Sequence, residues 1–89
     1  MIAPAKDTAA ALDRLLLVIS VLQDSDRPLT TGTLCNAMAN RAGREWSRDT
    51  VARDLRLLLR RGLVESIGGG RGATVTWRLV GSIALQPTA

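Results

Sequence analysis

The clearest pattern of apolar and polar positions lies between residues 46 and 63. Ser47 is a good N-cap, no proline or glycine interrupts the chain before Gly62, and Gly62 stands where a helix C-terminal glycine belongs. On a helix of 3.6 residues per turn, four aliphatic residues form one stripe that we expect to be buried: Val51, Leu55, Leu58 and Leu59. The opposite stripe is polar and rich in arginine: Asp49, Arg53, Arg56 and Arg60, with Arg48 and Thr50 flanking it in the first turn. The pattern predicts an amphipathic helix with a strongly charged outer face.

A second helical pattern covers residues 7–23. Aliphatic residues recur there at spacings of three and four and predict one broad buried face: Leu12, Leu15, Leu16, Ile19 and Leu22. Leu17 and Val21 fall on the far side of this helix. Two interpretations of that pair stay open: they are simply exposed aliphatic side chains, or they form part of a dimer interface that Ile83 and Leu85 extend.

Shorter elements connect these two helices. Residues 24–28 have the composition of a turn, and Leu29–Thr30 is expected to form a very short strand. A helix capped by Thr31 or Thr33 should follow through about residue 40, and a linker over residues 41–45 bends at a glycine. Trp46 is expected to anchor the next helix as an apolar contact just before its cap.

After Gly62 the pattern changes from helical to alternating. Residues 63–67 and 74–80 predict two strands, with Val75, Trp77 and Leu79 on one face of the second strand. Four glycines around Arg71 lie between the strands and predict a flexible hairpin tip. The fold class expected is therefore α+β, with three helices followed by a two-stranded β-hairpin. We expect a lead-in over residues 1–6, one domain over residues 7–80 and a tail over residues 81–89.

Composition shows that the positive charge of the chain is almost entirely arginine and is concentrated after residue 26. Twelve Lys and Arg stand against eight Asp and Glu, and the only lysine is Lys6, so eleven of the cations are arginine. The first 26 residues carry two cations and four acids, whereas the following residues carry ten arginines and four acids. A guanidinium fits phosphates and guanine edges, so this distribution favours an anionic partner over a surface that is basic only for solubility.

Several other classes of protein are disfavoured. Cys35 is the only cysteine and there is no histidine, so we expect no disulfide, no metal, no cofactor and no enzyme activity. The apolar run from Leu15 to Leu22 is too short to span a bilayer and lacks a cleavage site, so we expect no membrane partner and a cytoplasmic protein. No small-molecule effector is evident.

The order of predicted elements resembles a winged helix-turn-helix domain over roughly residues 8–80. The run Ser47-Arg-Asp-Thr-Val-Ala-Arg-Asp-Leu55, followed by Gly62-Leu-Val64, is similar to the recognition helix of DeoR-type transcriptional regulators. Those regulators also carry a large C-terminal sugar-phosphate-sensing domain, and their linker before the recognition helix is shorter. The resemblance therefore implies a DNA-binding module and nothing about effectors, and a small phage or bacterial regulator would have this size.

These observations predict a sequence-specific double-stranded DNA-binding protein, a small repressor-like transcriptional regulator. Recognition helices contact base edges mostly with their N-terminal half. We expect Arg53 to contact guanine and Arg48 to contact either guanine or a phosphate. Thr50 is expected to reach a phosphate or a thymine methyl group. Asp49 either accepts from cytosine or pairs with Arg53.

Other arginines are expected to meet the sugar-phosphate backbone. Arg56, Arg60 and Arg44 are candidate phosphate contacts, and Arg71 at the hairpin tip is expected to enter the minor groove. Asp54 lies off the outer face and should bond within the protein. Two copies, a homodimer, would allow a longer operator to be bound. The alternative is a winged-helix protein-protein interaction module whose DNA-binding face is idle.

Overall fold

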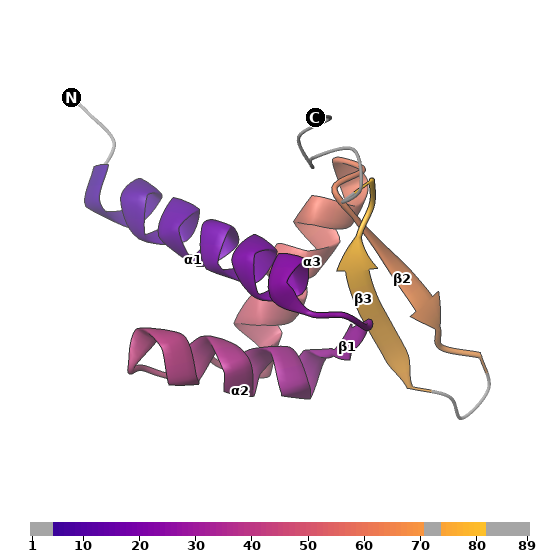
Figure 1. Ribbon diagram of the computed structural model, residues 1–89. Helices are drawn as coiled ribbons and strands as arrows, with labels where there is room; N and C mark the ends of the chain where they lie inside the picture. The colour runs from indigo at the N-terminus through magenta and orange to yellow at the C-terminus, as the bar shows by residue number, and fades with distance from the viewer. Residues whose placement is uncertain (1–4, 71–73, 82–89) are drawn as a thin grey trace, which may run out of the picture.

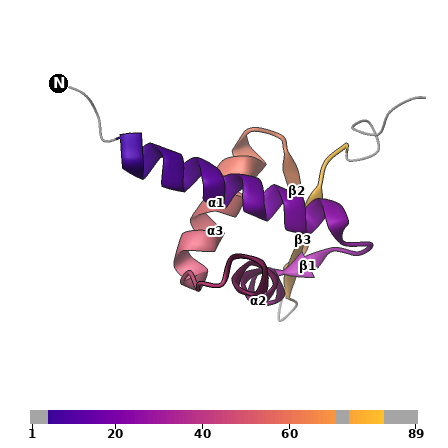
Figure 2. The same cartoon turned by 60° about the vertical axis from the view of Figure 1, so that its left-hand side comes forward.

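The computed structural model describes residues 5–70 and 74–81. The elements follow in the order α1 (Ala5–Asp24), β1 (Leu29–Thr30), α2 (Thr31–Ala42), α3 (Arg48–Arg60), β2 (Val64–Gly68) and β3 (Val75–Leu79). Figures 1 and 2 show α1 lying across α3, with α2 beneath both and the β2–β3 hairpin extending away from the helices. The predicted α+β winged helix arrangement is confirmed.

The sheet has one strand more than the hairpin that the sequence predicted. All strands are antiparallel in the order β1-β3-β2, with Leu29 opposite Trp77 in one ladder and Val64 opposite Leu79 in the other. The short strand expected at residues 29–30 therefore exists, and it pairs with β3, on the side of that strand opposite to β2. Because α2 begins at the residue after β1, this pairing ties the hairpin to the helices (Figure 1).

The core lies between the helices and one face of the sheet. Its largest fully buried side chains come from all three helices and from β2: Val18, Leu34, Met38, Val51, Leu55 and Val64. The predicted alternation of β3 is confirmed, since Trp77 and Leu79 are buried and Val75 is half-buried. The Trp77 indole N–H donates to the hydroxyl of Thr31 across 3.1 Å, which satisfies its polar edge.

The predicted buried face of α1 is only partly confirmed: Leu22 is buried, and Leu15 and Ile19 are half-buried and pack against the core, but Leu12 and Leu16 are not part of it. The side chains buried in the core are Val18, Val21 and Leu22, whereas Leu12 and Leu16 are 54% and 62% exposed. Val21, expected on the far side, is only 2% exposed and is not available to a second molecule. The helix is apolar on nearly every side, so hydrophobic spacing alone could not select the face on which α2, α3 and the sheet pack.

The predicted helix ends are largely confirmed. Thr30 caps α2 by accepting from the Thr33 N–H at 3.1 Å, one residue earlier than expected. That helix runs to Ala42, so Arg41 lies in its last turn and not in the linker. At the end of α3, Gly62 has a φ of +76°, and Leu63 donates its N–H to the Leu58 carbonyl across 2.9 Å. This is the glycine-terminated helix end that the sequence predicts.

Candidate nucleic-acid interface

Helix α3 separates an apolar face from a charged one. Its buried residues are Val51, Asp54, Leu55 and Leu58. The expected outer residues are all exposed: Arg48, Asp49, Arg53, Arg56 and Arg60. The prediction that Leu59 is buried was wrong, because its side chain is 39% exposed and lies outside the buried stripe. The charged face is therefore the one that the sequence predicted, and the buried face is slightly narrower.

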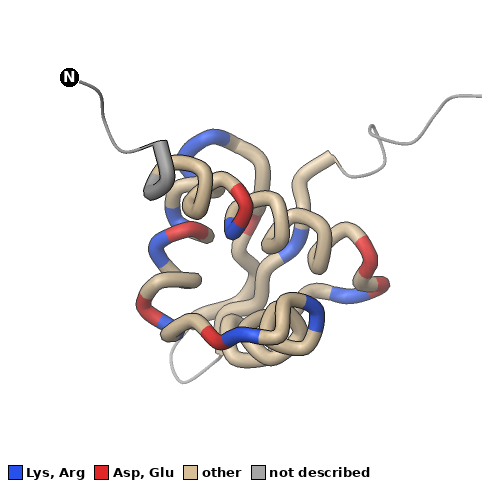
Figure 3. Tube along the Cα trace, turned by 90° about the vertical axis from the view of Figure 1, so that its left-hand side faces the viewer, with Lys and Arg blue, Asp and Glu red and all other residues tan. Residues whose placement is uncertain are grey.

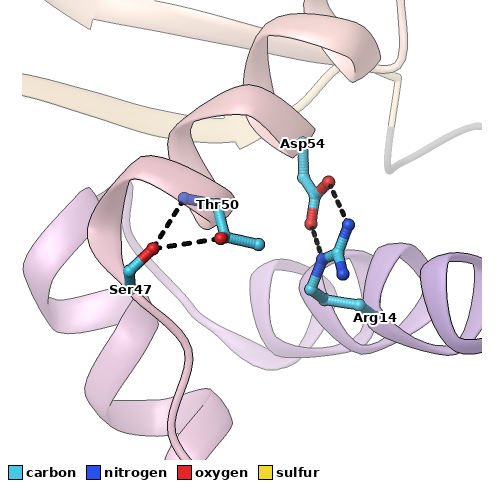
Figure 4. Close-up of polar contacts among 4 residues, drawn as sticks. All are labelled: Arg14, Ser47, Thr50 and Asp54. Carbon is cyan, nitrogen blue, oxygen red and sulfur yellow. Dashed lines mark hydrogen bonds and ion pairs between the residues drawn. The ribbon is translucent and has the colours of Figure 1, made fainter.

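The first turn of α3 is organised by its cap (Figure 4). The Ser47 hydroxyl oxygen accepts from the Thr50 N–H at 3.1 Å, and the Ser47 O–H donates to the Thr50 hydroxyl oxygen at 3.0 Å. Thr50 is half-buried, so a candidate contact residue also helps to hold the start of the helix. Removing such a cap typically costs about 1 kcal/mol of stability. The cap orients the N-terminal half of α3, where the candidate base contacts lie.

The arginines of the outer face have no acidic partner among the side chains of residues 8–70 and 74–81. The ion pairs found there join Arg14, Arg27, Arg41 and Arg78 to acids, and none involves an arginine of α3. The i,i+4 pair between Asp49 and Arg53, one of the two roles expected for Asp49, is not formed. The guanidinium groups of Arg48, Arg53, Arg56 and Arg60 thus remain available to an external anion.

Asp54 bonds within the protein, as predicted, and its partner is on α1 (Figure 4). Arg14 donates from Nε to one carboxylate oxygen at 2.5 Å and from Nη2 to the other at 3.0 Å. Asp54 is only 5% exposed, and its hydrogen bond with Arg14 holds the pKa of the guanidinium above its ordinary value. A fork of this geometry resists rotation, so it fixes α3 against α1.

Arg44 lies in the linker before α3, where its guanidinium stacks on an aromatic ring. The central guanidinium carbon is 4.7 Å from the centre of the Trp46 ring. Trp46 is half-buried and packs against the core, as expected of an apolar anchor. The cation–π contact holds the charge of Arg44 close to the start of α3.

The structure reveals one residue of this region that the sequence did not single out. A Cβ built on Gly32, in the first turn of α2, would lie 3.0 Å from Nη2 of Arg48. The guanidinium of Arg48 therefore lies against the backbone of α2. Burial raises the pKa of the nearby Cys35 thiol, and the positive charge of Arg48 acts in the opposite direction. The sequence offered one signal for this contact: Gly32 lies in the first turn of a helix, where most other residues are better helix formers.

The hairpin forms the predicted wing as far as the structure describes it. Gly68 and Gly69 have φ values of +83° and +85°, which glycine adopts readily as the chain leaves β2. Arg78 pairs with Glu65 across the two strands, so its charge is already matched. Arg71, the expected minor-groove contact, lies outside the described residues.

Two findings bear on other kinds of site. In the described part of the chain, no three side chains of the metal-binding types come together. No helix there is both long enough and apolar enough to cross a membrane.

Comparison with known proteins supports the fold. No protein-family model matches the chain, and no curated protein matches it. Among solved structures, the chain is similar to the reduced form of the transcriptional regulator YodB from B. subtilis, with a TM-score of 0.63 and 23% sequence identity. The match covers 97% of this chain and 82% of that one. At this identity the likeness shows the fold alone, and it gives no support specific to DeoR-type regulators.

Proposed function

We propose that this protein is a small transcriptional regulator that binds double-stranded DNA in a sequence-specific, repressor-like manner. The observation that carries the proposal is the outer face of α3, whose exposed arginines have no acidic partner in the described residues while the opposite face is buried. A helix of this kind fits the major groove of B-DNA. The fold, similar to that of the transcriptional regulator YodB, is consistent with this function and does not select it over others.

In this proposal the two halves of α3 have different tasks. Arg53, central on the exposed face, donates to a guanine edge, and Asp49, which does not pair with Arg53, accepts from a cytosine amino group. Thr50 contacts a phosphate or a thymine methyl group. Arg56 and Arg60, farther along the helix, contact phosphates.

Two arginines outside α3 complete the proposed interface. Arg44, held on the Trp46 ring, contacts a phosphate beside the start of the helix. Arg71, which follows β2 in the sequence, is proposed to enter the minor groove, where a narrow groove concentrates negative potential. This function also places the protein in the cytoplasm, with the DNA that it would bind.

Selection of bound duplexes from a random DNA pool tests the function directly. We expect enrichment of a defined sequence and binding that weakens steeply with salt, because each phosphate contact releases a counterion. Replacing Arg53 by alanine should weaken this binding. Arg27→Ala serves as the matched control and should not, since Arg27 is an exposed arginine outside α3 and the hairpin. Absence of binding to any duplex at low salt would overturn the proposal.

We further propose that two copies bind one operator, because a single winged domain contacts only a short half-site. Val21 is buried and Leu17 half-buried, so the exposed aliphatic surface that α1 offers to a homodimer is that of Leu12 and Leu16. Ile83 and Leu85, which were expected to extend the interface, lie outside the described residues. Sedimentation of the protein at high concentration, alone and with the selected duplex, tests this. One copy per duplex and a monomer in free solution would contradict it.

The second candidate function is a protein-protein interaction module. It is favoured by one observation, the exposed Leu12 and Leu16, which lie one turn apart on α1 and together offer an apolar surface. The DNA selection separates the two functions. A protein-interaction module would enrich no sequence, and its duplex binding would not change when Arg53 is replaced by alanine.

A further inference from the structure

The contact between Gly32 and Arg48 joins the first turns of two different helices. Gly32 is the second residue of α2 and Arg48 is the first residue of α3. The position that a Cβ on Gly32 would take is 3.0 Å from Nη2, 3.3 Å from Cζ and 3.6 Å from Nε of Arg48. All three atoms belong to the guanidinium group, so a Cβ at position 32 would crowd the charged end of Arg48, and a larger side chain would compete with it for space.

Gly32 has no conformational reason to be glycine. Its φ is not in the left-handed region, whereas Gly43, Gly62, Gly68, Gly69 and Gly81 all have positive φ values. A glycine in a helix destabilises it relative to alanine. The three atoms nearest to a Cβ at position 32 all belong to Arg48.

The location of the Arg48 guanidinium distinguishes it from Arg53. In helix-turn-helix proteins the first helix of the motif crosses the DNA backbone, while the second lies in the major groove. Here α2 is that first helix and α3 the second. In the proposed DNA complex, a guanidinium that lies against α2 would therefore be beside the sugar-phosphate backbone, although its own Cα belongs to α3.

We propose that Gly32 is a positioning residue for Arg48: by lacking a side chain it seats the guanidinium on α2, which makes Arg48 a phosphate contact and not a base contact. This inference rests on the proposed DNA-binding function and assigns one of its residues. Arg48 then contributes affinity for every duplex and little sequence preference.

A series of substitutions at position 32 tests the proposal on DNA. Arg48→Ala should weaken binding to all duplexes by a similar factor and make the salt slope less steep by about one unit. Gly32→Leu should reproduce both changes, because leucine occupies the guanidinium position. Gly32→Ala should have a smaller effect, since a guanidinium at 3.0 Å needs to move only slightly.

The decisive measurement is the double variant. Gly32→Leu should have no further effect on affinity or salt slope when Arg48 is already alanine, because the residue that it displaces is gone. Asn36→Leu is the matched control, as it adds the same side chain one turn along α2 at an exposed position. Its effect should be the same with and without Arg48. Thermal unfolding of each variant checks that the fold is kept.

The single cysteine provides a measurement that does not depend on DNA. The Arg48 charge opposes the rise in the Cys35 pKa that burial causes. The pH dependence of the reaction rate with iodoacetamide should therefore give a higher thiol pKa in Arg48→Ala and in Gly32→Leu than in the parent protein. Adding Gly32→Leu to Arg48→Ala should leave the thiol pKa unchanged.

The outcomes separate this proposal from the broader one. If Arg48→Ala changes the salt slope and the thiol pKa but Gly32→Leu changes neither, Gly32 does not position Arg48. If Gly32→Leu weakens DNA binding equally with and without Arg48, leucine clashes with DNA directly and the proposal is overturned. If the parent protein binds no duplex, the proposed function fails, and the thiol measurements alone decide whether Gly32 seats Arg48.

Discussion

Helices α1 and α3 pack against each other, yet their exposed faces have opposite character. The exposed face of α3 carries arginines, whereas α1 exposes Leu12 and Leu16. In Figure 3, charged positions recur along the trace of α3, whereas most of α1 is tan. The bidentate ion pair between Arg14 and Asp54 joins the two helices. A charged face suits a polyanion and an apolar face suits another apolar surface, so the two helices are equipped for different partners.

The same contrast explains how well each helix could be predicted. The charged and apolar stripes of α3 are opposite each other, so only one orientation buries the aliphatic residues without burying arginine. Leucine, isoleucine and valine surround most of α1, and several orientations bury similar apolar area. The core then selects the face centred on Val18, and Leu12 and Leu16 remain outside.

The largest effect on stability should come from replacing a buried leucine of α1 by alanine, compared with the same replacement of an exposed leucine. Leu22→Ala should lower the free energy of unfolding by about 3 kcal/mol, because it opens a cavity in the core. Leu16→Ala removes the same atoms from an exposed position and should change it by less than about 0.5 kcal/mol. Urea denaturation measures both. An equal loss for the two variants would mean that α1 packs through a different face.

The ion pair between the helices should have the next largest effect. Asp54→Ala leaves the guanidinium of Arg14 without its partner in a site that is mostly buried, and should cost about 2 kcal/mol of unfolding free energy. Arg41→Ala breaks the more exposed pair with Asp24 and should cost less than about 1 kcal/mol. If the two losses were equal, the contact between α1 and α3 would not depend on Asp54.

On DNA, the two halves of α3 should respond differently. Arg53→Ala should cost about 1–3 kcal/mol of binding free energy and relax the preference at one base pair. Arg60→Ala should weaken binding to all duplexes alike and reduce the salt slope by about one unit. Binding isotherms at several salt concentrations, on selected and scrambled duplexes, distinguish these results. Identical behaviour of the two variants would remove the proposed division of α3.

The smallest effect on stability belongs to the exposed face of α1. Leu16→Glu should leave the unfolding free energy of the monomer within about 0.5 kcal/mol, because the side chain is largely in water. It should nevertheless weaken self-association measured by sedimentation, since a charge would have to be buried in the dimer contact. Self-association that is unchanged in this variant would exclude Leu16 from the dimer surface.

Local chemistry determined much of this protein. The Ser47 cap, the glycine end at Gly62 and the alternation of β3 follow from hydrogen bonds and side-chain periodicity within a few residues, and the structure confirms each. The outer face of α3 belongs to the same class, because its stripe of arginines is a property of one helix. Its contacts with DNA remain predictions.

Only the tertiary structure decided which distant residues meet. Four features join segments that are far apart in the chain: the buried face of α1, the pairing of β1 with β3, the ion pair of Asp54 with Arg14, and the contact of the Arg48 guanidinium with Gly32. Arg14 and Asp54 are separated by 40 positions, and no local pattern relates them. Periodicity specifies which side chains share a face of one element, whereas the packing of all elements selects what that face contacts.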